Sequence, residues 1–175
     1  MFQSGLQKAD EDWCHCNVAS GEDLPVNLLT EFQGVVLTGS HFNVRDASSP
    51  ESTIKKWFDS VSEFIRQASE RGSPRIYGGC FGTQIITAAL GGEVDFNPNK
   101  RFVFKAETVC FCSTPDRLVE IFHLSGMMDE DDDFIKMEQA FVNQQKLQLI
   151  VSHGDCVKTL PPEAEQIGTS IYHIL

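Results

Sequence analysis

Apolar residues follow a helical spacing in one stretch of the sequence, residues 54–68, where they recur every three or four positions. This spacing is typical of one face of an amphipathic helix. Ser52 or Thr53 can cap its start, and Gly72 can end it. The pattern therefore predicts a helix over 54–70 with one apolar, partly aromatic face packed on a sheet, formed by Ile54, Trp57, Phe58, Val61, Phe64, Ile65 and Ala68.

Short β-branched runs before and after this helix predict strands at 32–39 and 76–79. A strand, a helix and a second strand in this order form a right-handed parallel unit. The polar loop 40–50 follows the first strand, at the sheet edge where open α/β folds bind ligands. Weaker patterns predict a turn at 21–25 and another at 97–99. They also predict strands at 13–19, 93–96, 102–112, 146–153 and 167–171, with two helices around an acidic run between 115 and 145.

Length and charge narrow the class of protein. A chain of 175 residues suits one domain, so we expect a single α/β domain over 1–175. A net charge of −11 disfavours nucleic acids and anionic membranes as partners, because both bind clusters of Lys and Arg. No apolar run is long enough for a signal peptide or a membrane span, so we expect a cytoplasmic protein.

The six cysteines allow two interpretations. Cys14 and Cys16 are separated by one residue, as are Cys110 and Cys112, which could indicate a metal site. Zinc ligands, however, are usually separated by two to four residues. We therefore expect no metal, and reduced, mostly buried thiols in a cytoplasmic protein.

The stretch 75–90, RIYGGCFGTQIITAAL, carries the candidate chemistry. It reads as a strand, a sharp turn with Cys80 among Gly78, Gly79 and Gly82, and then a helix. Glycines allow the strained geometry of such a turn, and the helix N-terminus stabilises an anion beside it. A buried cysteine in a glycine-rich turn is the alternative. The strand and helix on either side favour Cys80 as a nucleophile.

Several motifs together resemble the class I glutamine amidotransferases. They are GEDLP at 21–25, VVLTGSHFNVRD at 35–46, GGCFGTQ at 78–84, ALGGEV at 89–94 with the following NPN, and SHGDCVKTLPPEA at 152–164. The nearest resemblance is to the stand-alone, GMP-synthase-like branch that includes the γ-glutamyl peptidases. It implies a three-layer, flavodoxin-like fold with a mostly parallel central sheet and helices on both faces.

The resemblance also implies roles for particular residues. Cys80 would attack the side-chain amide of glutamine and form a glutamyl thioester, with oxyanion N–H groups from Gly39 and Phe81. The substrate pocket would be lined by Gln84, Ser152, His153 and Gly154. No metal or cofactor is implied. The substrate would be glutamine or a γ-glutamyl compound, and both amidotransfer and γ-glutamyl peptide hydrolysis remain open, as do a synthetase partner and a homo-oligomer.

The sequence departs from the family at both ends. No strand precedes Trp13, and no His-Pro-Glu motif, which supplies the family's general base, follows the LPP turn. His153 matches a pocket position, and His173 lies in IYHIL without the Pro and Glu. We therefore expect a chain truncated at both ends that hydrolyses glutamine poorly. A catalytically dead binding or regulatory module of the same fold is the alternative.

Overall fold

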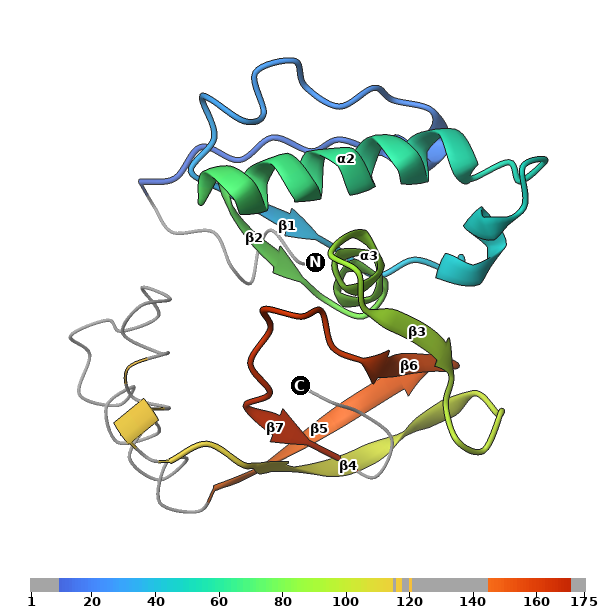
Figure 1. Cartoon of the computed structure of the whole chain (residues 1–175), viewed down its shortest axis with the longest axis vertical. Coiled ribbons are helices and arrows are strands. Elements are labelled where there is room, and N and C mark those ends of the chain that lie inside the picture. The colour runs from blue at the N-terminus through green and yellow to red at the C-terminus, as the bar shows by residue number, and fades with distance from the viewer. Residues whose placement is uncertain (1–9, 115, 118–119, 121–144, 171–175) are drawn as a thin grey trace. The chain divides into compact units, whose positions relative to one another are not determined.

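The computed structural model describes residues 10–114, 116–117, 120 and 145–170 (Figure 1). The Cα positions divide the chain into two compact units, Met1–Val94 and Asp95–Leu175, and each is described by itself. The helices predicted between 115 and 145 fall almost entirely outside the described residues. Among the helices that the structure describes, none has the length and apolar character to cross a membrane.

The first unit contains the predicted parallel strand–helix–strand unit. Strand β1 (Gly34–Leu37) pairs in parallel with β2 (Arg75–Gly78), and α2 (Lys55–Arg71) connects them (Figure 1). The register sets Val35 opposite Ile76 and Leu37 opposite Gly78. Both strands and the helix are confirmed, with ends shifted by a few residues.

The core of the first unit lies between α2 and α3 (Phe81–Ala89). The apolar face predicted from the sequence provides Val61, Phe64, Ile65 and Ala68, each at most 6% exposed. From α3 come Phe81, Ile85 and Ala89. Burial of a large apolar side chain contributes about 1.5–3 kcal/mol, so this layer stabilises the turn that joins β2 to α3.

Of the two predicted ends of α2, only the C-terminal one is confirmed. The N-cap residue is Ile54, without a side-chain cap bond, rather than Ser52 or Thr53. Ser52 Oγ accepts a hydrogen bond from the Ile54 N–H at 3.3 Å, before the helix begins. Gly72 follows the helix in the left-handed region, φ 69°, and its N–H donates to the last-turn carbonyls of Ala68 and Ser69. Glycine adopts this conformation without the steric cost of a Cβ.

The strand predicted at 13–19 is wrong. The chain there forms no strand and ends in a short 3-10 turn, η1 (Val18–Ser20), with Gly21 in the left-handed region. Asn17 Oδ1 accepts from the Ser20 N–H at 3.2 Å, and Glu22 Oε2 accepts from the Asn17 N–H at 2.6 Å. These local side-chain bonds satisfy the backbone without a neighbouring strand. A second short turn, η2 (Val44–Ser48), lies in the predicted loop 40–50.

The second unit is built on antiparallel pairs. Strand β4 (Val103–Phe111) pairs with β5 (Lys146–His153) and with β7 (Gly168–Thr169). Strand β3 (Glu93–Phe96) leads into the unit, and its Asp95 and Phe96 lie beside β6 (Asp155–Thr159). The predictions for β3, β4 and β5 are confirmed. Strand β6 was not predicted, and β7 is shorter than predicted within the described residues.

Strand β1 pairs with β2 in parallel, while both pairings of β4 are antiparallel. The mostly parallel, three-layer sheet therefore stays a prediction. The faces of β4 differ sharply: Val103, Glu107 and Val109 are buried, whereas Phe104 is 74% exposed.

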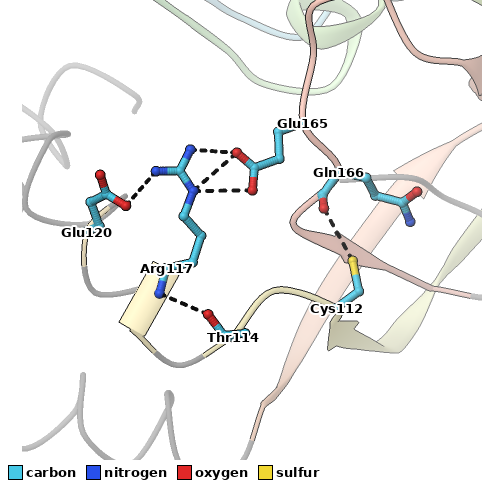
Figure 2. Close-up of polar contacts among 6 residues, drawn as sticks. All are labelled: Cys112, Thr114, Arg117, Glu120, Glu165 and Gln166. Atoms are coloured by element: carbon cyan, nitrogen blue, oxygen red, sulfur yellow. Dashed lines mark hydrogen bonds and ion pairs between the residues drawn. The ribbon is translucent and has the colours of Figure 1, made fainter.

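A bidentate ion pair joins two distant segments of the second unit (Figure 2). Arg117 Nη2 lies 2.6 Å from Glu165 Oε2, and its Nε lies 3.2 Å from both carboxylate oxygens. Its Nη1 also bonds Glu120 at 2.7 Å. Nearby, the Cys112 thiol donates to the Gln166 carbonyl at 3.3 Å. These contacts connect the chain after β4 to the chain before β7.

Candidate active site

Cys80 lies in a strained turn between β2 and α3. Its backbone has φ 55° and ψ −112°, and its side chain is exposed. A non-glycine residue in such a region costs about 1–3 kcal/mol and persists only where its surroundings enforce it. The geometry places the thiol at the N-terminus of α3, as the sequence predicts for a nucleophile on a strand-to-helix turn.

Two glycines enforce this turn by allowing close backbone contact. A Cβ added at Gly82 would lie 2.0 Å from the Leu37 carbonyl oxygen of β1. A Cβ at Gly78 would lie 2.6 Å from the Thr83 nitrogen. The Gly79 N–H also donates to the Leu37 carbonyl at 2.9 Å. The start of α3 is therefore pressed against the end of β1, and no side chain fits at either glycine.

The predicted oxyanion donors lie around Cys80. A Cβ built on Gly39 would come within 3.5 Å of the Cys80 Cβ and 3.9 Å of its Sγ, so Gly39 borders the thiol. Phe81 is the first residue of α3, and N–H groups in a first helical turn have no intrahelical acceptor. Gln84, one turn further, is buried at 9% exposure, and its N–H donates to the Cys80 carbonyl at 3.2 Å.

Aromatic packing fixes the side of the turn that faces the loop 40–50. The Phe81 and Trp57 ring centroids are 5.9 Å apart, and Trp57 lies 5.7 Å from Phe42 of that loop. The loop also lines a hollow of about 540 Å³ with Arg45 and Ser49 among its walls. The predicted site wall is thus attached to the same aromatic cluster that supports α3.

The other predicted pocket residues lie in the second unit, where β5 ends and β6 begins. Ser152 is exposed and pairs with Phe104 of β4, while His153 is 7% exposed and pairs with Val103. His153 Nδ1 lies 3.0 Å from the Asp155 carbonyl oxygen. A carbonyl only accepts, so Nδ1 carries the proton in this bond. Gly154 joins the two strands.

The structure thus brings Gly39, Phe81 and Gln84 together with Cys80 in the first unit. Ser152, His153 and Gly154 adjoin one another in the second.

The cysteines differ from the expectation of mostly buried thiols. None of the six forms a disulfide, and only Cys156 is buried, whereas Cys14, Cys80, Cys110 and Cys112 are exposed. Burial raises the pKa of Cys156, assisted by the charges of Asp155 and Asp95. Burial also raises the pKa of Cys16, with the Glu22 charge next. Within the described ranges no three His, Cys, Asp or Glu residues are grouped as metal ligands.

Comparison with known proteins shows which enzymes the sequence resembles. No protein-family model matches the sequence. The sequence is 29% identical, over 159 residues and 91% of its length, to GMP synthase [glutamine-hydrolyzing] of Blochmanniella pennsylvanica, and covers 24% of that protein. It is 30% identical, over 130 residues and 74% of its length, to the enzyme of the same name from Bordetella avium, and covers 19% of it. The sequence of this chain is thus similar to part of two glutamine-hydrolyzing enzymes and is glutamine amidotransferase-like.

Solved structures agree with this fold. A glutamine amidotransferase from Thermotoga maritima superposes with a TM-score of 0.60 at 22% identity, over 90% of this chain and 55% of that one. A glutamine amido transferase from Methylobacillus flagellatus gives a TM-score of 0.62 at 20% identity, over 90% and 50%. The amidotransferase-like chain spans about a quarter or less of the two GMP synthases that it resembles.

Proposed function

We propose that this amidotransferase-like chain carries the glutamine-amide-cleaving site, with Cys80 as the nucleophile. The observation that carries the proposal is the enforced turn: a strained, exposed cysteine at a helix N-terminus, bordered by Gly39 and by a first-turn N–H. Strain at one reactive side chain, maintained by two glycines that admit no Cβ, is typical of functional sites. Sequence similarity to glutamine-hydrolyzing GMP synthases supports the same chemistry.

The reaction proposed is an acyl transfer to sulfur. Cys80 Sγ, as thiolate, attacks the side-chain carbonyl carbon of glutamine and forms a tetrahedral intermediate. The N–H groups of Gly39 and Phe81 stabilise its oxyanion, and each such donor typically contributes about 10²–10³-fold to the rate. The C–N bond then breaks, the nitrogen leaves as ammonia after taking a proton, and a glutamyl thioester remains. Water later hydrolyses the thioester to glutamate and restores the thiol.

The residues proposed to bind the substrate are Gln84 in the first unit and Ser152, His153 and Gly154 in the second, as the resemblance to the family implies. The three-layer, mostly parallel sheet of the family is part of the proposal, as is a single domain over 1–175. The substrate is a small molecule, glutamine or a γ-glutamyl compound, and the chemistry needs neither metal nor cofactor.

The fate of the nitrogen divides the proposal into two forms. In the first, a synthetase partner in the cytoplasm takes the ammonia, as the names of the GMP synthase relatives suggest. In the second, the chain hydrolyses γ-glutamyl peptides without a partner. Release of product from glutamine, compared with release from a γ-glutamyl dipeptide at equal concentration, separates the two.

A catalytically dead binding module of the same fold is the alternative function. Proton transfer by a positioned side chain contributes about 10²–10⁴-fold to a reaction rate, so a module without such a side chain would turn glutamine over poorly. A binding module would still hold glutamine but would not be acylated by it.

Covalent labelling tests the nucleophile without requiring turnover. The protein is incubated with a chloromethyl ketone analogue of glutamine, and peptides are mapped by mass spectrometry. We expect one adduct on Cys80, slowed by added glutamine and absent in Cys80→Ala. Cys112→Ala, which removes another exposed thiol, should label like the wild type.

Two results would overturn the assignment. One is an adduct that forms mainly on Cys14, Cys110 or Cys112. The other is labelling of Cys80 that excess glutamine does not slow, because such labelling would show a reactive thiol without a glutamine site.

A further inference from the structure

Asn97 has a buried side chain that the proposed mechanism does not use. It is 1% exposed, the least exposed polar residue among those described. Its Oδ1 accepts from the Asn99 N–H at 3.1 Å and from the Arg101 N–H at 3.4 Å. Its Nδ2 donates to the Arg101 carbonyl. A buried amide with both ends bonded fixes its surroundings, because each lost bond leaves a buried polar group unpaired.

The turn after β3 is wound around this side chain. The Lys100 N–H donates to the Asn97 carbonyl at 2.9 Å, and Lys100 itself adopts a left-handed φ of 51°. Asparagine side chains commonly bond to backbone groups two residues further along a turn. The turn 97–101 is therefore set by one residue rather than by strand pairing.

The same residue reaches the proposed pocket. The Asn97 N–H donates to the Gly154 carbonyl at 3.1 Å. Gly154 follows His153, whose ring is held by the Asp155 carbonyl. A bond to Gly154 from a rigid turn therefore restrains the peptide directly after His153. All of these contacts lie within the unit 95–175.

We propose that Asn97 is a positioning residue for the glutamine pocket, holding the His153–Gly154 backbone in place through the Gly154 carbonyl. The inference rests on the proposed function, since His153 and Gly154 bind substrate only there. Asn97 touches neither the substrate nor the thiol in this account. Its loss should weaken binding of glutamine and leave the intrinsic reactivity of Cys80 unchanged.

Asn97→Asp is the main test variant. It keeps two acceptor oxygens but loses the donor to the Arg101 carbonyl and adds a buried charge facing a carbonyl. Asn99→Asp is the matched control, because it makes the same chemical change in the same turn at an exposed side chain. Asn97→Ser retains one acceptor and is a milder variant if the aspartate variant does not fold.

The measurement is the rate of labelling by the glutamine chloromethyl ketone against its concentration. We expect Asn97→Asp to raise the half-saturating concentration about tenfold or more, the equivalent of one lost hydrogen bond. The maximal labelling rate and the rate of Cys80 alkylation by iodoacetamide should stay at the wild-type values. Asn99→Asp should match the wild type, and Asn97→Ser should fall between them.

The outcomes separate this inference from the proposed function. Wild-type protein that is not labelled at Cys80 overturns the proposed function, and the inference with it. Labelled wild type with an unchanged half-saturating concentration in the Asn97 variants overturns the inference alone. An equal loss of labelling and of iodoacetamide reactivity also overturns it, because that loss shows a general structural role.

Discussion

The two units fix their candidate residues by different physical means. In the first, Cys80 is held by contact: two glycines lie where no Cβ fits, and the α2–α3 core presses the turn against β1. In the second, His153 Nδ1 donates a hydrogen bond to the Asp155 carbonyl, and the Gly154 carbonyl accepts one from the Asn97 N–H. Steric contact leaves no alternative position, whereas a hydrogen bond can be replaced by water. We therefore expect the nucleophile to tolerate change less than the pocket.

The largest loss of stability is expected where steric contact holds the Cys80 turn. Gly82→Ala places a Cβ 2.0 Å from the Leu37 carbonyl oxygen, a backbone atom that cannot move aside. We expect a loss of about 3 kcal/mol in the free energy of unfolding. Urea denaturation measures this loss, together with amide exchange in β1 and α3.

Gly34→Ala is the control for that prediction. Its Cβ would meet only the Arg75 carbonyl oxygen at 3.7 Å, an ordinary contact, and Gly34 lies in β1, the strand that Gly82 approaches. We expect its stability to remain within about 0.5 kcal/mol of the wild type. Equal stability of the two variants would show that the close approach at Gly82 does not exist.

A smaller effect tests the strain at the nucleophile itself. Glycine adopts φ 55° and ψ −112° without a Cβ clash, whereas alanine does not. We expect Cys80→Gly to be more stable than Cys80→Ala by about 1 kcal/mol, the reverse of the usual order of these residues. Thermal unfolding of both variants measures the difference, and a more stable alanine variant would contradict the strained turn.

The smallest effect concerns the exposed ion pair of the second unit. Hydrogen bonds from Arg117 lower the pKa of Glu165 (Figure 2). A lowered native pKa adds stability above the unfolded value, about 4.3, and that stability is lost as the pH falls through the native pKa. Arg117→Ala should return the Glu165 pKa towards its ordinary value, measured by NMR titration.

Arg117→Lys should return the Glu165 pKa in part, because a lysine cannot make the bidentate contact. An unchanged titration of Glu165 in Arg117→Ala would show that the pair does not form in solution.

The elements that the sequence predicts well are those with a long or strict pattern. The helix at 54–70 and the strand at 146–153 each carry enough residues for their period to be read. The stretch 13–19 alternates as a strand would, yet Asn17 and Glu22 bond to the local backbone instead. Strand β6 was missed because Gly154-Asp155 reads as the end of β5, whereas the chain turns there and continues extended.

The candidate site divides in the same way. Cys80 and its glycines form one continuous sequence motif, so their turn could be predicted from residues adjacent in the sequence. Asn97 was interpreted only as part of a turn, since its bond to Gly154 depends on a contact far along the chain. Local strain can be read from sequence, whereas a long-range hydrogen bond requires the fold.

Acylation by glutamine itself tests the central claim most directly. The protein is mixed with glutamine and quenched in acid, and its intact mass is measured beside Cys80→Ala. The account predicts a mass increase of one glutamyl group on Cys80, released by hydroxylamine, with ammonia formed in equal amount. Glutamine that binds but leaves the mass of the wild type unchanged and releases no ammonia would contradict the claim that Cys80 is a nucleophile.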